Sequence, residues 1–147
     1  SMIVQSTRFG ELDVPEEQIL DFPQGVLGFP AEKQFALMEY KPNSPFYLLQ
    51  SLTDANLTFL MINPFAFFND YEFTMDDALM AEIGVTADNP PTVFNIATVK
   101  DKIETMTVNL AGPVLVNMRD RKAAQWVIEK TVFPTKYPLF PATAGGK

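Results

Sequence analysis

The side chains in this sequence that could carry chemistry are carboxylates and lysines. The sequence contains no histidine and no cysteine, which removes the commonest general base, the commonest metal ligand and the thiol nucleophile. Zinc sites and Ser-His or Cys-His catalysis are therefore excluded. What remains is carboxylate or lysine chemistry, or a hard-cation site built from oxygen ligands. We therefore expect a protein that is not an enzyme and that binds no cofactor.

Two groups of carboxylates could still form a site. Asp13, Glu16 and Glu17 could hold a divalent cation, but they lack the regular oxygen ligands and the central glycine of an EF-hand loop. A solvated surface is the better interpretation. Asp76 and Asp77 are adjacent in sequence, and adjacent residues of a helix do not face one another. Their position favours a role at the start of a helix over a catalytic pair.

The acidic residues are unevenly distributed. The formal net charge is −7, and no lysine or arginine lies between Pro42 and Val99. The carboxylates of that span are Asp54, Asp70, Glu72, Asp76, Asp77, Glu82 and Asp88. Such a surface repels nucleic-acid phosphates, so we expect no direct nucleic-acid binding. It suits a basic partner, although acidic surfaces also serve solubility alone.

Length and composition indicate one domain. We expect a single domain over residues 2–140 and a flexible tail over 141–147, with Ser1 as a cleavage remnant before the natural start at Met2. No apolar run reaches the ~18 residues of a membrane span. The absence of cysteine fits a reducing compartment. We expect a cytoplasmic protein that does not contact the membrane.

Short apolar runs separated by proline, glycine, asparagine or aspartate predict strands. They are Ile3–Ser6, Glu11–Val14, Ile19–Phe22, Phe35–Met38, Phe46–Leu52, Leu57–Ile62, Val93–Val99, Met106–Leu110, Val114–Met118 and Gln125–Glu129. Their regular spacing favours an all-β barrel or sandwich. We predict a mainly all-β fold, a small antiparallel β-barrel-like domain with one or two short helices.

One helix is predicted near Met75–Ile83. Thr74 could cap it, and Met75, Leu79 and Ile83 would form one apolar stripe. Gly84 stands where a left-handed glycine would end the helix.

The later strands contain two further signals. Gly112-Pro113 interrupts a strand pattern and predicts a barrel corner. The polar span Arg119–Lys122 predicts a hairpin turn before Gln125–Glu129. Trp126 would then be a core residue of that strand, or an anchor for a partner if its edge is exposed.

The stretch Asn63–Tyr71 is unusually aromatic and follows a predicted buried strand. Phe65, Phe67 and Phe68 cannot all point inward from an extended segment. At least one ring must be exposed or covered by another element, and the following helix is the expected cover. We expect Asp70 and Tyr71 to point outward.

Several segments occur in a fixed order that is typical of one family. They are Phe9–Val14, Ile19–Phe29, Ser44–Ser51, Asn63–Tyr71, Met106–Asn117 and Tyr137–Phe140. Together they resemble the family of the flagellar assembly factor FliW over nearly all of Met2 to Phe140. The resemblance implies a non-enzymatic protein that binds flagellin and the basic RNA-binding regulator CsrA in the cytoplasm. By switching between these partners it would relieve the repression of flagellin translation.

The same stretches supply the candidate contacts. We expect Asn63, Pro64, Phe65, Asp70 and Tyr71 to contact partners first, followed by Asn109, Pro113 and Asn117, with Glu72, Asp76 and Asp77 adding negative charge. An acidic protein docked beside an RNA-binding surface would repel RNA. Alternatively, Asn63 and Asn109 satisfy the backbone at barrel corners. A different class of function, a small barrel that binds an apolar ligand or acts on it by carboxylate chemistry, also stays open.

Overall fold

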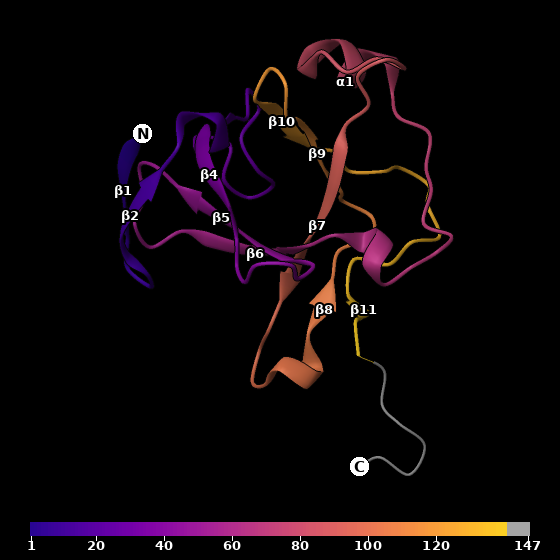
Figure 1. The fold of residues 1–147 in the computed structure, drawn as a ribbon. Helices are drawn as coiled ribbons and strands as arrows, with labels where there is room; N and C mark the ends of the chain where they lie inside the picture. The colour runs from indigo at the N-terminus through magenta and orange to yellow at the C-terminus, as the bar shows by residue number, and fades with distance from the viewer. Residues whose placement is uncertain (141–147) are drawn as a thin grey trace.

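Strands make up most of the regular secondary structure in residues 1–140, which are the residues that the computed structural model describes (Figure 1). The tail predicted at 141–147 lies outside the described residues. The strands are β1 (Met2–Ser6), β2 (Gly10–Val14), β3 (Ile19–Asp21), β4 (Gln34–Glu39), β5 (Phe46–Ser51), β6 (Thr58–Ile62), β7 (Thr92–Thr98), β8 (Thr107–Val108), β9 (Val114–Asn117), β10 (Lys122–Gln125) and β11 (Tyr137–Pro138). The helices are α1 (Asp77–Ile83) and the 3₁₀ turns η1 (Glu16–Gln18), η2 (Pro64–Ala66) and η3 (Ile103–Thr105). None of these helices has the length and apolar composition needed to cross a membrane.

Seven strands close into a ring. The order is β3, β4, β5, β6, β7, β9 and β10, because β7 pairs with both β6 and β9 while β10 pairs with both β9 and β3. The pairs are antiparallel, except for a short parallel contact between β10 and β3. The chain therefore forms a closed barrel, which confirms the predicted mainly β fold. In Figure 1, β8 and β11 lie below the barrel and the β1–β2 hairpin lies at its left.

Alternate side chains of the ring strands fill the barrel interior. Leu49 of β5, Met61 of β6 and Phe94 of β7 belong to one buried cluster. Ala36 of β4 points the other way and packs against the β1–β2 hairpin. The runs predicted as strands between Ile3 and Val99 all form strands. β4 and β5 are buried on both faces, which fits their nearly continuous apolar sequence.

The corner predicted at Gly112-Pro113 is confirmed. Strands β8 and β9 lie one after the other along the same edge of β7, where β8 pairs with the end of that strand and β9 with its start. The chain between them turns at Asn109–Pro113. A Cβ on Gly112 would lie only 2.8 Å from the side-chain nitrogen of Asn109, so the turn leaves little room for a larger residue there. β8 is shorter than predicted, although Met106, Val108 and Leu110 are all buried as the alternation requires.

The strand predicted at Gln125–Glu129 was wrong, because β10 spans Lys122–Gln125 instead. The turn before it is short, since Arg121 adopts a positive φ of 59° and Lys122 already pairs with Asn117. Trp126 follows the strand and is half-buried, with its ring 5.5 Å from that of Phe73.

The helix forms where predicted but its cap differs. Asp76, and not Thr74, is the N-cap, and its carboxylate accepts a hydrogen bond from the Leu79 amide. Gly84 ends α1 with a φ of 74°, as predicted. The buried Ile83 packs against the outer face of β9 and β10.

Candidate functional site

The exposed aromatic ring Phe65 marks the candidate site, and the residues before it hold it in place. Chain pairing in β6 ends at Ile62, and the Asn63 side chain then accepts a hydrogen bond of 3.0 Å from the Phe65 amide. Pro64 occupies the first turn of η2, where its missing N–H costs nothing. Pro64 is buried, whereas Phe65 is 52% exposed. The sequence therefore fixes the turn with two residues and presents the third to solvent.

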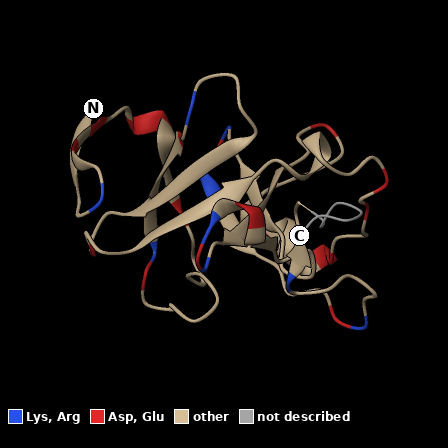
Figure 2. Cartoon of the chain, turned by 90° about the horizontal axis from the view of Figure 1, so that it is seen from below, with Lys and Arg blue, Asp and Glu red and all other residues tan. Residues whose placement is uncertain are grey.

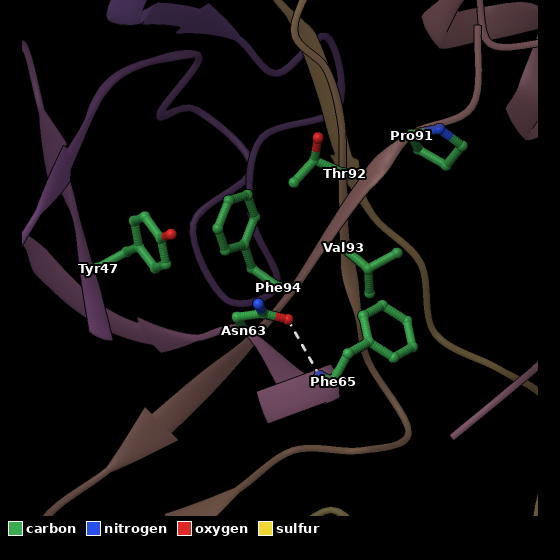
Figure 3. Close-up of a pocket in the computed structure, with 7 residues that line it drawn as sticks. All are labelled: Tyr47, Asn63, Phe65, Pro91, Thr92, Val93 and Phe94. Carbon is green, nitrogen blue, oxygen red and sulfur yellow. Dashed lines mark hydrogen bonds between the residues drawn. The ribbon is translucent and has the colours of Figure 1, made fainter. Parts of the chain in front are cut away.

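A small pocket of about 270 Å³ opens beside this ring (Figure 3). It is lined by Tyr47, Asn63, Phe65, Pro91, Thr92, Val93 and Phe94. Figure 3 shows the Phe65 ring beside Val93. The rings of Tyr47 and Phe94 meet edge to face, with centroids 4.9 Å apart. The lining contains no carboxylate and no lysine. The pocket is thus suited to receive an apolar side chain of a partner and has no acid–base pair for catalysis.

The rings of Phe67 and Phe68 are covered by the end of the described chain. The prediction that α1 covers them was wrong. Phe67 lies 6.4 Å from Phe140 and Phe68 lies 5.5 Å from Tyr137, measured between ring centroids. Both rings pack against a second core cluster that includes Leu139. The sequence did not predict this contact, because Tyr137–Phe140 lies far from Phe67 and Phe68 along the chain. Tyr137–Phe140 is nevertheless one of the segments that resemble the family.

Tyr71 was expected to point outward, and this was wrong because its side chain is only 5% exposed. Its hydroxyl donates a hydrogen bond of 2.6 Å to the Leu110 carbonyl and accepts one of 3.1 Å from the Asn95 amide. Burial raises the pKa of the phenol, and the bond from Asn95 partly opposes this shift. The centroid of the Tyr71 ring lies 6.3 Å from that of Phe65, so the buried ring is a neighbour of the exposed one.

Asn109 and Pro113 lie at the corner between β8 and β9. The Asn109 side chain accepts a hydrogen bond of 3.0 Å from the Ala111 amide, as the alternative interpretation expected. The backbone carbonyl of Asn109 accepts a hydrogen bond of 2.9 Å from the side-chain amide of Asn95. The same Asn95 amide donates to the Tyr71 hydroxyl. Pro113 is buried. This corner is therefore connected to the Phe65 turn through Asn95 and Tyr71, a link that sequence reasoning missed.

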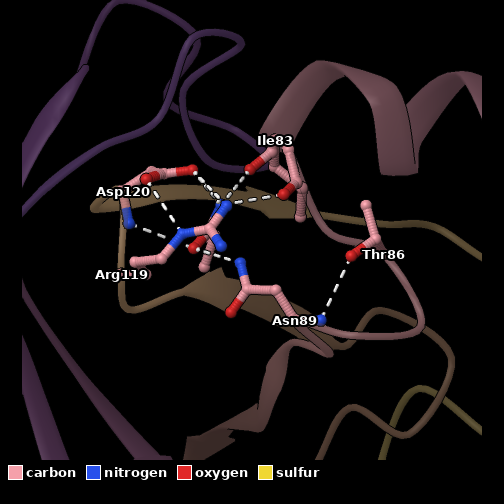
Figure 4. A network of polar contacts seen from close by, with 7 residues as sticks. Ile83, Thr86, Asn89, Arg119 and Asp120 are labelled. Carbon is pink, nitrogen blue, oxygen red and sulfur yellow. Dashed lines mark hydrogen bonds and ion pairs between the residues drawn. The ribbon is translucent and has the colours of Figure 1, made fainter.

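Asn117 lies elsewhere, in a polar network at the end of α1 (Figure 4). Its buried amide donates to the carbonyls of Ile83 and Gly84, at 2.7 and 3.2 Å, and to the Asp120 carboxylate at 3.0 Å. Its oxygen accepts from Asn89 and from the Asp120 backbone amide. Asn117 thus joins the helix end to the β9–β10 turn and offers no exposed surface.

The carboxyl group of Asp120 completes this network. Hydrogen bonds from Arg119 and then from Asn117 hold its pKa below the usual value. Arg119–Asp120, at 3.3 Å, is the only ion pair within residues 1–140.

The acidic residues that follow the aromatic turn are exposed. Asp70, Glu72, Asp76 and Asp77 all face solvent, and none of them has an ion-pair partner among the described residues. Figure 2 shows red segments along the loops on the right of the molecule, with blue beside red in one of them. Phe65 is therefore followed in sequence by four carboxylates that form no ion pair with any residue between 1 and 140. We refer to Phe65, Asp70, Glu72, Asp76 and Asp77, exposed residues that follow one another along the chain from the aromatic turn to the start of α1, as the acidic aromatic surface.

Comparison with known proteins gives a consistent result. The family model described as FliW protein matches residues 3–139. The chain is 45% identical to the flagellar assembly factor FliW of Desulfitobacterium hafniense (strain Y51), over 95% of this chain and 91% of that protein. It is 36% identical to FliW of Bacillus subtilis (strain 168), over 94% and 96% of the two chains. A crystal structure of the flagellar assembly factor FliW superposes with a TM-score of 0.88 at 32% identity, covering 97% of this chain and all of that one.

Proposed function

Because the chain belongs to the FliW family of flagellar assembly factors, we propose that it binds flagellin and the regulator CsrA in the cytoplasm. Bound to CsrA, it would relieve the repression of flagellin translation. Bound to flagellin, it would leave CsrA free to repress. The protein would act by exchanging partners and not by catalysis.

One observation carries this proposal: an exposed aromatic ring is followed by exposed, unpaired carboxylates. The ring at Phe65 can anchor a partner in the manner of an interface hot spot. Asp70, Glu72 and Asp77 add negative charge, which attracts a basic partner such as CsrA and speeds the encounter. The same segment therefore supplies an apolar anchor and the negative charge that suits a basic partner.

The same charge offers a way to expel RNA. Coulomb interactions near a surface fade over about 8 Å at physiological salt, so the carboxylates act only on phosphates that lie close to the docked protein. An acidic surface beside the RNA-binding face of CsrA lowers the positive potential there. RNA affinity then falls even where the RNA site is not covered.

The alternative of a barrel that binds an apolar ligand requires an enclosed cavity with a converging carboxylate. The interior of this barrel is instead packed with fully buried side chains, among them Phe35, Leu49 and Met61. No observation therefore favours that alternative.

Size-exclusion chromatography of the protein mixed with purified CsrA, and separately with flagellin, tests the proposal. We expect co-elution with each partner alone. In a three-component mixture, flagellin should displace CsrA. Failure to co-elute with either protein would overturn the proposal.

A further inference from the structure

A second surface, on the outer wall of the barrel, has the opposite charge. The wall has an apolar floor where three strands pair: Leu48 of β5 lies opposite Leu60 of β6, and Leu60 lies opposite Ala97 of β7. These side chains face away from the interior, because their neighbours Leu49, Met61 and Ile96 pack in the barrel core. The floor belongs to a groove of about 990 Å³.

The walls of this groove come from three separate connections. The β1–β2 turn supplies Phe9, the β4–β5 turn supplies Tyr40, and the β7–β8 connection supplies Val99 and Ile103. Tyr40 is 48% exposed and Ile103 is 55% exposed. Large apolar side chains are thus presented to solvent around an apolar floor, which is a feature of interaction sites.

Each connection also contributes one cation. Arg8, Lys41 and Lys100 line the groove, with Asp101 as the only carboxylate among its lining residues. None of the three cations forms an ion pair with any residue between 1 and 140. The Lys41 ammonium lies 5.9 Å from the centre of the Tyr40 ring. In a chain with a net charge of −7, three converging cations make this groove a local positive site, which we call the basic groove.

We propose that the basic groove binds a peptide segment of a partner protein, one whose apolar side chains are flanked by carboxylates. The exposed side chains of Tyr40, Val99 and Ile103 suit the apolar face of an amphipathic segment. Behind them, the floor of Leu48, Leu60 and Ala97 is largely buried. The cations on three walls match carboxylates on the other face of that segment. A nucleic acid fits less well, because it offers no aliphatic face to match the floor, although the rings of Phe9 and Tyr40 could stack on bases.

The basic groove is separate from the acidic aromatic surface and shares no lining residue with the Phe65 pocket. The protein therefore presents two surfaces of opposite charge, and two partners of opposite charge could each find a site. This inference rests on the groove alone, so it stands or falls independently of binding to CsrA.

A fluorescence titration tests the proposal with defined probes. The first probe is a fluorescein-labelled peptide with leucines at i, i+3, i+4 and i+7 and glutamates between them. The second has lysines in place of the glutamates, the third has serines in place of the leucines, and the fourth is a single-stranded RNA. We expect saturable binding of the first probe only, weakened by added salt.

Two variants locate the binding. Lys41→Glu combined with Lys100→Glu should lower the affinity for the acidic probe by at least about tenfold. Ile103→Ser should lower that affinity without altering its salt dependence. The control, Lys122→Glu with Lys136→Glu, makes the same charge change outside the groove and should bind within about twofold of the unaltered protein. Thermal melting checks that each variant is folded.

Several results would overturn the proposal. They are absence of saturable binding, equal binding of the lysine peptide, preferred binding of RNA, and equal losses in the groove and control variants. Self-association of the free protein that disappears in the groove variant would assign the groove to a second copy of the chain and would also overturn it.

Discussion

The Tyr71 hydroxyl donates a hydrogen bond of 2.6 Å to the carbonyl oxygen of Leu110, thirty-nine residues further along the chain. This bond joins the aromatic turn after β6 to the corner between β8 and β9. Asn95 strengthens the junction, because its amide donates both to the Tyr71 hydroxyl and to the Asn109 carbonyl. The buried ring of Tyr71, which lies next to the exposed ring of Phe65, is therefore held in place by a buried polar link.

Tyr71→Phe should destabilise the protein by about 1 kcal/mol near neutral pH, since it removes the hydroxyl and leaves the Leu110 carbonyl without this donor. It should also change the pH dependence. Burial raises the pKa of the folded phenol above its ordinary value of 10.0. The neutral phenol thus stabilises the fold fully below that value, and the contribution is lost as pH rises through the folded pKa.

Urea unfolding measured in steps from neutral pH into the alkaline range checks this. The unaltered protein should lose stability more steeply above about pH 10 than Tyr71→Phe does. Parallel curves for the two proteins would contradict the assignment.

Phe65→Ala should weaken CsrA or flagellin binding by at least about tenfold. Because the ring is about half exposed, it should cost only about 1 kcal/mol of unfolding free energy. Phe22→Ala, at a fully buried site, should cost about 3–5 kcal/mol. Isothermal titration alongside urea unfolding separates the two effects. A large stability loss with unchanged binding would make Phe65 a core residue instead of a contact.

Asn117→Ala should destabilise the fold by about 3 kcal/mol, because it leaves the Ile83 and Gly84 carbonyls and the Asp120 amide without their partner. The matched control is Asn69→Ala at an exposed position, which should change stability by less than about 0.5 kcal/mol. Chemical denaturation of both variants measures the difference. Equal effects would show that the network at the end of α1 contributes little.

Gly25→Ala and Gly10→Ala form a second matched pair. Both glycines have positive φ, 69° and 75°, so both substitutions strain the backbone by about 1–2 kcal/mol. At Gly25 the added Cβ would also lie 2.5 Å from the Phe29 carbonyl oxygen, whereas at Gly10 nothing lies within 4 Å. We expect Gly25→Ala to cost about 3 kcal/mol or more, visible as a lower melting temperature than that of Gly10→Ala. Equal melting temperatures would refute the close approach.

Much of the fold could be predicted from local patterns. Short apolar runs bounded by turn residues placed most strands of the barrel, and Gly84 and Gly112 marked a real helix end and a real corner. The errors arose where two local signals competed. Thr74 and Asp76 are both good caps, and only the path of the backbone selects Asp76. At β10 the small buried residues Ala123 and Ala124 gave a weaker strand signal than the apolar run after them.

The conformation of the candidate site depends more on contacts between residues that are far apart in the sequence. Composition and charge identified Phe65 and the carboxylates, which are indeed exposed. They could not show that Tyr71 turns inward, because its partners Asn95 and Leu110 come from other strands and corners. The cover of Phe67 and Phe68 likewise comes from residues near the end of the described chain. Such choices are made by tertiary packing, which a local pattern does not encode.

The central claim is that the acidic aromatic surface expels RNA from CsrA, and a charge-reversal titration tests it most directly. Asp70, Glu72 and Asp77 are changed together to lysine, while Asp76 is kept because its carboxylate caps α1. The control carries the same change at Asp13, Glu16 and Glu17, which are exposed on the other acidic stretch. Release of a labelled RNA from CsrA is followed by fluorescence anisotropy. We predict that the control releases RNA as the unaltered protein does, whereas the reversed variant needs at least about tenfold more protein. Equal release by the reversed variant would contradict the account.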